Sequence, residues 1–176
     1  MSNINVTPSI RGEYKDTIKY KDGTVEVHED HNLIVDGIFN LITSLLATKS
    51  EYKGLQYWAI GEGLSSWNSE APPQPTAKDV KLVKEIDRKL ISPSNISWVT
   101  DRGEPSESPT NRLKVSVTFG YDECTGNWRE FGLFGGNATV SADSGILINH
   151  KNHGLIVKTT EMEINREIIF TFTKAE

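Results

Sequence analysis

The stretch "WREFGLFGG" (Trp128–Gly136) places one Arg-Glu pair among aromatic residues, a leucine and glycines, in a chain that is otherwise polar. Three interpretations compete: a glycine-rich phosphate loop, a catalytic carboxylate in apolar surroundings, and a structural strand that ends in a sharp turn. No Lys-Ser/Thr pair follows the glycines, as a phosphate loop requires. No second carboxylate is placed across from Glu130, as a glycosidase requires. We therefore interpret residues 128–136 as a sheet strand that packs its apolar side chains and ends in a glycine turn.

The segments on both sides of this stretch also have strand patterns. "RLKVSVTF" (112–119) alternates apolar and polar residues, and "GILINH", "HGLIVKTT" and "EINREIIFTFTK" follow at short intervals. Near the N-terminus, "TIKYKDGTVEVHED" alternates on both sides of Asp22-Gly23, which predicts a β-hairpin. Short strands at this spacing predict a mainly β chain, an antiparallel β-sandwich or barrel-like single domain.

One segment has helical spacing instead. Apolar residues recur at intervals of three and four in residues 32–48, and Asn32 is available as the N-cap, so we predict one amphipathic helix there. The segment "VKLVKEIDRKLI" (80–91) fits a helix or a strand equally well.

The expected layout is one structural domain over all 176 residues. It consists of an N-terminal arm and hairpin (1–31), the helix (32–48) and a β-rich body (55–173). Two long polar loops interrupt the body, at 64–79 and 100–112. Loops of this length in a compact domain usually carry function or attach the domain to a partner.

Composition narrows the classes of function. The formal net charge is −5, and Lys and Arg are scattered, so we expect no nucleic-acid partner. The apolar runs are too short for a membrane span, and the N-terminus does not resemble a signal peptide, so we expect no membrane and synthesis in a cytoplasm. Cys124 is the only cysteine, which excludes an internal disulfide and a cysteine-based zinc site.

Four histidines form two His-x-x-His pairs that could supply one metal ion if they met in space. They lie where polar residues collect at strand ends, and no ligand-spacing motif accompanies them, so we expect neither a metal nor a cofactor. These residues are His28, His31, His150 and His153.

Glu130 stands in the most apolar segment of the chain. A carboxylate placed there is costly without a partner, so we expect a structural ion pair with Arg88 or Arg166. No arrangement of nucleophile and base stands out in the sequence, and we expect no enzyme.

The four tryptophans fall into two groups. Trp58 and Trp128 lie in strand-like segments and are expected in the core. Trp67 and Trp98 lie in or beside polar loops, where an exposed aromatic ring can anchor a protein interface or stack on a sugar.

The order of these motifs resembles the N-terminal attachment domains of tail-collar and tail-fibre proteins of tailed bacteriophages. The motifs are "NLIVDGIFNLITSLL", "YWAIGEG", "LVKEIDRKLI", "KVSVTFGYDECTGNWREFGLFGG" and "GILINHKNHGLIVKTTEMEINREIIFTF". The resemblance covers roughly residues 32–172. The matching positions, which are scaffold positions in that family, are Gly61, Gly63, Leu82, Glu85, Arg88, Glu130, Gly132, Leu133, Phe134 and Lys158, and we add Gly135 as a structural glycine.

The resemblance implies a virion component without enzymatic activity, made in the host cytoplasm. Fibre proteins continue into a repetitive shaft that this sequence lacks, so we expect an adaptor or ring subunit of the tail, baseplate or neck. It would form a homo-oligomer and attach fibres or neighbouring virion proteins through its long loops. The alternative is a glycan-binding β-sandwich in host-surface recognition, with Trp67 or Trp98 as the stacking platform.

Overall fold

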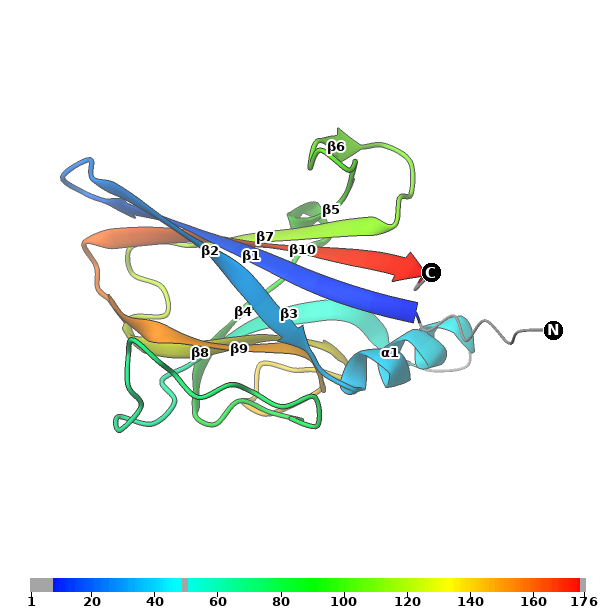
Figure 1. Cartoon of the computed structure of the whole chain (residues 1–176), viewed down its shortest axis with the longest axis horizontal. Helices are drawn as coiled ribbons and strands as arrows, with labels where there is room; N and C mark the ends of the chain where they lie inside the picture. The colour runs from blue at the N-terminus through cyan, green and yellow to red at the C-terminus, as the bar shows by residue number, and fades with distance from the viewer. Residues whose placement is uncertain (1–7, 49–50, 175–176) are drawn as a thin grey trace.

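The computed structural model describes residues 8–48 and 51–174, and it consists mainly of β-strands with one α-helix at one end (Figure 1). The helix is α1 (Gly37–Leu46), and a short 3-10 turn, η1, spans Pro93–Asn95. The strands are β1 (Pro8–Tyr20), β2 (Val25–Ile34), β3 (Lys53–Gly61), β4 (Glu85–Leu90), β5 (Ile96–Val99), β6 (Pro105–Ser106), β7 (Arg112–Phe119), β8 (Gly126–Gly136), β9 (Ile146–Lys158) and β10 (Met162–Lys174).

The strands form one antiparallel sheet in the order β4-β3-β8-β9-β2-β1-β10-β7-β5-β6. The sheet folds over itself into two layers, and β2 belongs to both of them (Figure 1). Residues 25–32 of β2 pair with β1 in the upper layer, and only Leu33 and Ile34 pair with β9 in the lower layer. The sheet does not close into a barrel. The predicted class, a mainly β antiparallel sandwich with one helix, is confirmed.

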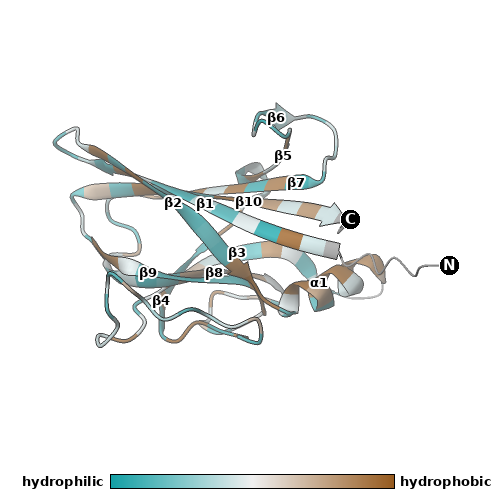
Figure 2. Cartoon of the chain, in the orientation of Figure 1, coloured by the Kyte–Doolittle hydropathy of each residue, from teal (hydrophilic) through white to brown (hydrophobic). Residues whose placement is uncertain are grey.

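The core lies between the two layers, and the alternation of the strands fills it. On β7, Val115, Val117 and Phe119 are buried, whereas the residues between them point away from the core. Figure 2 shows the resulting bands of hydrophobic and hydrophilic residues along the strands of the upper layer. Trp58 and Trp128 are fully buried, as predicted, and the Phe119 ring meets Trp128 edge-on at 5.0 Å.

The centre of the lower layer, at residues 130–136 of β8, is buried on both of its faces. Its outer face carries a second apolar cluster, which the chain between β3 and β4 and the turn between β8 and β9 cover. This explains why β8 is apolar at consecutive positions rather than at alternate ones. The cluster consists of Val35, Ala59, Leu82, Phe134, Ala138 and Leu147.

The predicted start of the helix is wrong. The helix begins at Gly37 with Asp36 as its N-cap, and Asn32 lies in β2 with its buried side chain over Gly12. Continued strand pairing of residues 32–34 takes precedence over the capping that Asn32 offers to an isolated helix.

Other predicted boundaries change in a similar way. The hairpin around Asp22-Gly23 is confirmed, and the ambiguous segment 80–91 contains strand β4. The two strands predicted at 145–160 are one continuous strand, β9. The loop predicted at 100–112 contains the short strand β6, and its last residue begins β7. Part of the predicted N-terminal arm, residues 1–7, lies outside the described residues.

Two neighbouring isoleucines of β10 test which face of the upper layer packs against the core between the layers. Ile168 has no exposed surface, whereas Ile169 points outward and is half-buried. We expect Ile168→Ala to lower the free energy of unfolding by about 2–5 kcal/mol, because it leaves a cavity between the layers. Ile169→Ala, measured by the same urea titration, should cost less than half as much. Equal losses would contradict the assigned orientation of β10.

Candidate functional site

Glu130 is a buried carboxylate of the lower layer that is held by four hydrogen bonds. It has no exposed surface, and its partners differ from the arginines that the sequence suggested. Its Oε1 accepts hydrogen bonds from the amides of Gly63 (3.1 Å) and Lys84 (2.8 Å), and its Oε2 accepts one from the amide of Val83 (2.9 Å). One carboxylate on β8 therefore holds both ends of the loop between β3 and β4.

His150, on the neighbouring strand β9, extends this arrangement. Its Nε2 lies 3.0 Å from Glu130 Oε2 and its Nδ1 lies 2.8 Å from Asp79 Oδ2, both within hydrogen-bond distance. Asp79 lies in the loop and also accepts from the amide and the hydroxyl of Thr76. Since ionised carboxylates only accept hydrogen bonds, His150 satisfies both partners when both ring nitrogens carry protons. We call Glu130, His150 and Asp79 the ionic clamp.

Both carboxylates of the ionic clamp are held in the ionised form. Burial alone would raise the pKa of Glu130, but the hydrogen bonds from His150, Lys84 and Val83 outweigh burial and lower that pKa. Burial would likewise raise the pKa of Asp79, and the bonds from Thr76 and His150 lower it. With both nitrogens bonded and 1% of its surface exposed, His150 has no free atom for acid–base chemistry.

Two glycines allow the loop to approach Glu130. A Cβ on Gly61 would lie 2.5 Å from Cγ and Oε1 of Glu130. Gly63 has a positive φ of 54°, and a Cβ there would overlap the ring of Trp67. Gly132 and Gly135 also lie in close contacts, the first against Leu147 and the backbone of Asn149, the second against the backbone of Gly54.

Arg88 pairs with Glu85 of the same strand rather than with Glu130. The guanidinium donates from Nε and Nη2 to the two carboxylate oxygens at 2.5 and 2.7 Å. Its Nη1 donates to the carbonyls of Thr139 and Ser144, and the guanidinium lies over the ring of Phe134. This pair fastens the turn between β8 and β9 to β4.

Arg166 pairs with Asp16 inside the core. The two residues lie opposite each other on β10 and β1, and Nε and Nη2 donate to the carboxylate at 2.6 and 2.5 Å. Neither side chain has more than 1% of its surface exposed. The guanidinium carbon lies 4.3 Å from the centroid of Phe131. Arg166, one of the two arginines expected to pair with Glu130, thus lies in the opposite layer.

The buried Lys158 completes the set of scaffold residues. Its Nζ donates to the carbonyls of Gly120, Tyr121 and Thr159, so it fixes the turn between β7 and β8. Burial lowers the pKa of this amine.

The four histidines do not come together. His28 and His31 are exposed on β2, whereas His150 and His153 are buried on β9, contrary to the expected surface positions. Within residues 8–48 and 51–174, no cluster of three or more His, Cys, Asp or Glu side chains has a metal-binding arrangement. Burial, with the nearby charge of Arg166, lowers the pKa of His153 to about 3, so its ring is neutral.

Among the described residues, an apolar opening lies between α1 and the edges of the two layers. Two adjoining hollows of about 250 and 410 Å³ share Gly54, Leu55, Ile96 and Leu113 as lining residues. We call these hollows and their rim the apolar opening. The remaining lining residues are Ile38, Leu41, Ile42, Leu45, Ile91, Pro93, Ser97, Trp98, Ile148, Phe170 and Phe172.

The rim of the apolar opening includes one of the two tryptophans proposed for an interface. Trp98 is 40% exposed, and Leu45 of α1 is 42% exposed on the other side. Figure 2 shows α1 as a largely hydrophobic element. Trp67, by contrast, is half-buried against Gly63, and its ring is not a free platform.

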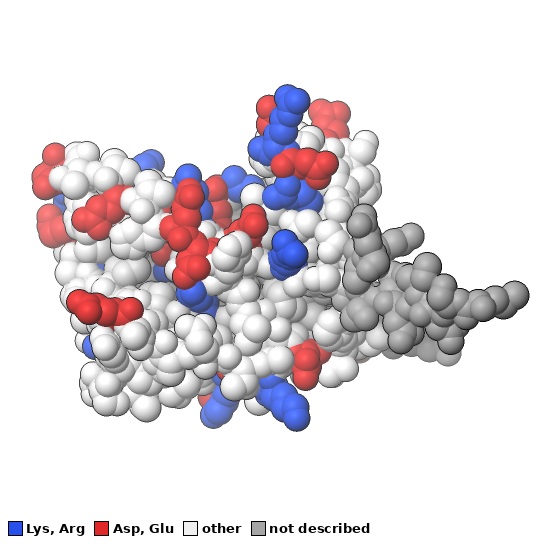
Figure 3. Space-filling model, in the orientation of Figure 1, with Lys and Arg blue, Asp and Glu red and all other residues white. Residues whose placement is uncertain are grey.

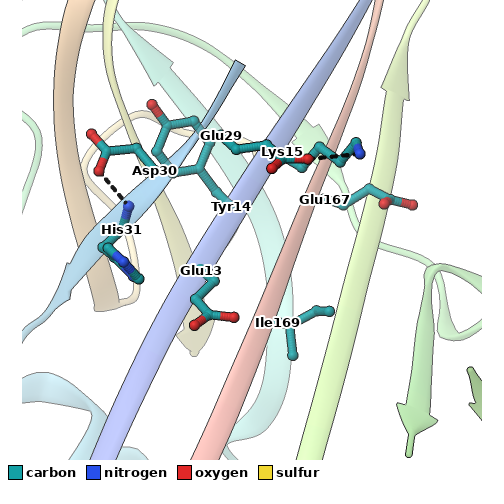
Figure 4. Close-up of a pocket in the computed structure, with 8 residues that line it drawn as sticks. All are labelled: Glu13, Tyr14, Lys15, Glu29, Asp30, His31, Glu167 and Ile169. Carbon is teal, nitrogen blue, oxygen red and sulfur yellow. Dashed lines mark hydrogen bonds and ion pairs between the residues drawn. The ribbon is translucent and has the colours of Figure 1, made fainter. Parts of the chain in front are cut away.

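The outside of the upper layer carries an acidic hollow midway along its strands. A hollow of about 450 Å³ on the outside of β1, β2 and β10 contains four carboxylates, and Figure 4 shows the ion pair of one of them, Glu29, with Lys15. Lys151 and Lys114, which lie outside this hollow, pair with two of the others, Asp30 and Glu167. Acidic side chains also gather over β1 and β2 in the face shown in Figure 3. Exposed pairs of this kind add little stability, so we interpret this face as solvated. The carboxylates belong to Glu13, Glu29, Asp30 and Glu167.

Comparisons with protein-family models, with curated proteins and with solved structures find no match to this chain. In the part of the chain that the structure describes, no helix is long and apolar enough to cross a membrane.

The ionic clamp predicts that a small change to the carboxylate of Glu130 lowers the stability of the fold markedly. Glu130→Gln removes the charge and replaces one accepting oxygen by an NH₂ group, which cannot accept the hydrogen bonds that this oxygen receives. We therefore expect a loss of about 1.5–3 kcal/mol in the free energy of unfolding. Glu29→Gln breaks an exposed ion pair and should cost at most about 1 kcal/mol. Urea titration at neutral pH measures both. If the two variants were equally stable, Glu130 would not hold the loop.

His153 predicts a pH dependence of stability. Its pKa of about 3 in the folded chain lies below the ordinary 6.5. Between these two pH values, the histidine is protonated in the unfolded chain and neutral in the folded chain. This stability is complete above 6.5 and is lost as the pH falls toward 3.

Chemical denaturation between pH 6.5 and about 5 isolates this residue from the carboxylates. His153→Gln should make the slope shallower by up to about 1.4 kcal/mol per pH unit. His31→Gln, an exposed histidine, should leave the slope unchanged. An unchanged slope in the His153 variant would mean that this ring titrates normally.

Proposed function

We propose that this chain is a structural protein of a virion tail or tail-like particle, without enzymatic activity. It would act in the tail, baseplate or neck as an adaptor that oligomerises and attaches fibres or neighbouring proteins. The resemblance in motif order to phage tail proteins supports the proposal that the chain is part of such a particle. The apolar opening is the observation that carries the mode of action.

An apolar opening at the end of a sandwich favours contact with another protein. Trp98 and Leu45 on its rim are exposed to water, and the buried core residues Ile148 and Phe170 line its floor. Exposed apolar surface that continues into a core commonly marks an interface. Covering it with protein would gain roughly 25 cal/mol for each Å² of apolar surface removed from water.

A second copy of the same chain is the occupant that we propose for the apolar opening. The opening is a self-complementary feature, with a protruding helix edge at Leu45 and Leu46 beside an apolar hollow. In a two-fold contact, the helix edge of each copy would cover the hollow of the other. The acidic face around β1 and β2 would remain outward in that arrangement and would keep the assembly soluble.

The buried polar groups also favour a structural role. Glu130, His150 and Arg88, which by residue type could serve catalysis, have their hydrogen-bonding atoms engaged with backbone and neighbouring side chains. Their bonds join loops to the sheet. Such groups would give a particle subunit fixed loops before it meets its neighbours.

Light scattering of the purified protein tests this proposal. We expect a native mass that is a defined multiple of 19.6 kDa. Leu45→Glu places a charge in the apolar contact and should shift the protein to a monomer without loss of circular-dichroism signal. Val27→Glu is a matched control, because Val27 is 51% exposed on the distant hairpin.

Two results would contradict this mode of assembly. One is a wild-type protein that remains monomeric at high concentration. The other is a Leu45→Glu variant with the same native mass as the wild type.

A further inference from the structure

A second, polar cavity lies where β2 separates from β9. It measures about 510 Å³, within the range of roughly 300–1,000 Å³ of small-molecule sites. It shares no lining residue with the apolar opening. Its walls come from β1, β2, β9 and residues 69–74 of the loop that the ionic clamp holds.

The register of β2 creates this cavity. Leu33 and Ile34 are the residues of β2 that pair with β9, and from there β2 continues with β1 into the upper layer. The side chains of His28 and Asp30 therefore line the cavity together with Lys151 and His153, and the contact between Lys151 and Asp30 joins the two strands there through side chains rather than through the backbone. The loop closes one side, where Asn152 Nδ2 donates to the carbonyl of Pro73 at 2.9 Å.

Two buried acceptors in the wall have no protein partner among the described residues. Asn152 is 4% exposed, and since its Nδ2 bonds Pro73, its Oδ1 is left without a donor. His153 is 8% exposed, and its Nδ1 donates to the carbonyl of Gly154 at 2.7 Å. That bond fixes the tautomer, so Nε2, which no described residue bonds, is an acceptor. Buried acceptors of this kind are costly unless a donor reaches them.

Two of the three carboxylates in the wall are compensated, and the third, Glu70, lies exposed on the loop without an ion pair among the described residues. Asp16 is neutralised by Arg166 behind it, and Asp30 by Lys151, whose Nζ donates to it at 2.6 Å. A cationic ligand would therefore meet two fixed cations beside these carboxylates. Neutral donors such as hydroxyl groups satisfy the acceptors without that repulsion.

We propose that this cavity binds a neutral, hydroxyl-rich small molecule, a sugar or a polyol. Hydroxyl groups would donate to Asn152 Oδ1 and His153 Nε2. The apolar parts of the wall, at Pro72, Leu155 and Ile156, would contact the C–H groups of the ligand. This site lies apart from both tryptophans that the sequence suggested as stacking platforms, and it is independent of the oligomerisation proposed above.

Saturation-transfer NMR and calorimetry on the whole chain test the site. The probes are D-glucose, D-galactose, N-acetyl-D-glucosamine and myo-inositol, with agmatine as a cationic probe. We expect at least one of the neutral probes to bind and agmatine to show no saturation transfer. His153→Phe keeps a flat ring but removes the acceptor, and should weaken binding by about tenfold. His31→Phe makes the same change on the exposed outer face and should leave binding unchanged.

A measurement on the wild type keeps the test valid if His153→Phe does not fold. With ¹⁵N-labelled histidine, the Nε2 signal of His153 should move when the bound probe is added, because a hydroxyl group donates to it. Absence of binding by all neutral probes, an unmoved Nε2 signal, or binding of agmatine alone would each overturn the proposal.

Discussion

A carboxylate that has lost all contact with water needs a donor for each oxygen, and Glu130 obtains most of its donors from one loop. Amides at both ends of that loop, at Gly63 and at Val83–Lys84, donate to it, and His150 links it to Asp79, which lies in the last third of the loop. A polar segment of more than twenty residues is thereby held against the sheet. It covers the second apolar cluster, and it also forms one wall of the polar cavity.

Buried charge is used in the same way elsewhere in the molecule. Arg88 and Glu85 fasten one turn, Lys158 fastens another, and Arg166 with Asp16 joins the two ends of the chain inside the core. Ion pairs of this kind add less stability than well-packed apolar groups would, but removal of one member leaves a costly unpaired charge. Their common effect is that each fixes one arrangement of segments that are distant in sequence.

Local patterns predicted the parts of this fold that depend on neighbours in sequence. The alternation of residues 112–119 and the turn at Asp22-Gly23 specify strands and a hairpin without reference to the rest of the chain. The start of the helix was missed because β2 continues to Ile34 by pairing with β9, a strand more than a hundred residues away. The same limit applies to Glu130. Its burial could be inferred from its apolar neighbours, but the choice of His150 over an arginine depends on the register of β8 and β9, which pairs His150 with Gly132, two residues from Glu130. The polar cavity has no signal in the sequence, since it arises from the divergence of two strands.

The pairing of β1 with β10 has a consequence for how the chain folds as it is made. Residues 8–20 lie between β2 and β10, and all thirteen positions of β1 match a partner in residues 162–174. On a ribosome the first strand would emerge long before the last, so until then only the hairpin with β2 can form, and a lone hairpin is marginal in water. Until β10 is made, Asp16 would likewise lack Arg166, its counter-ion. We therefore expect the upper layer to fold late and cooperatively. The chain between β1 and β10 must close into a long loop, at a cost in entropy, before the two strands can form stabilising hydrogen bonds.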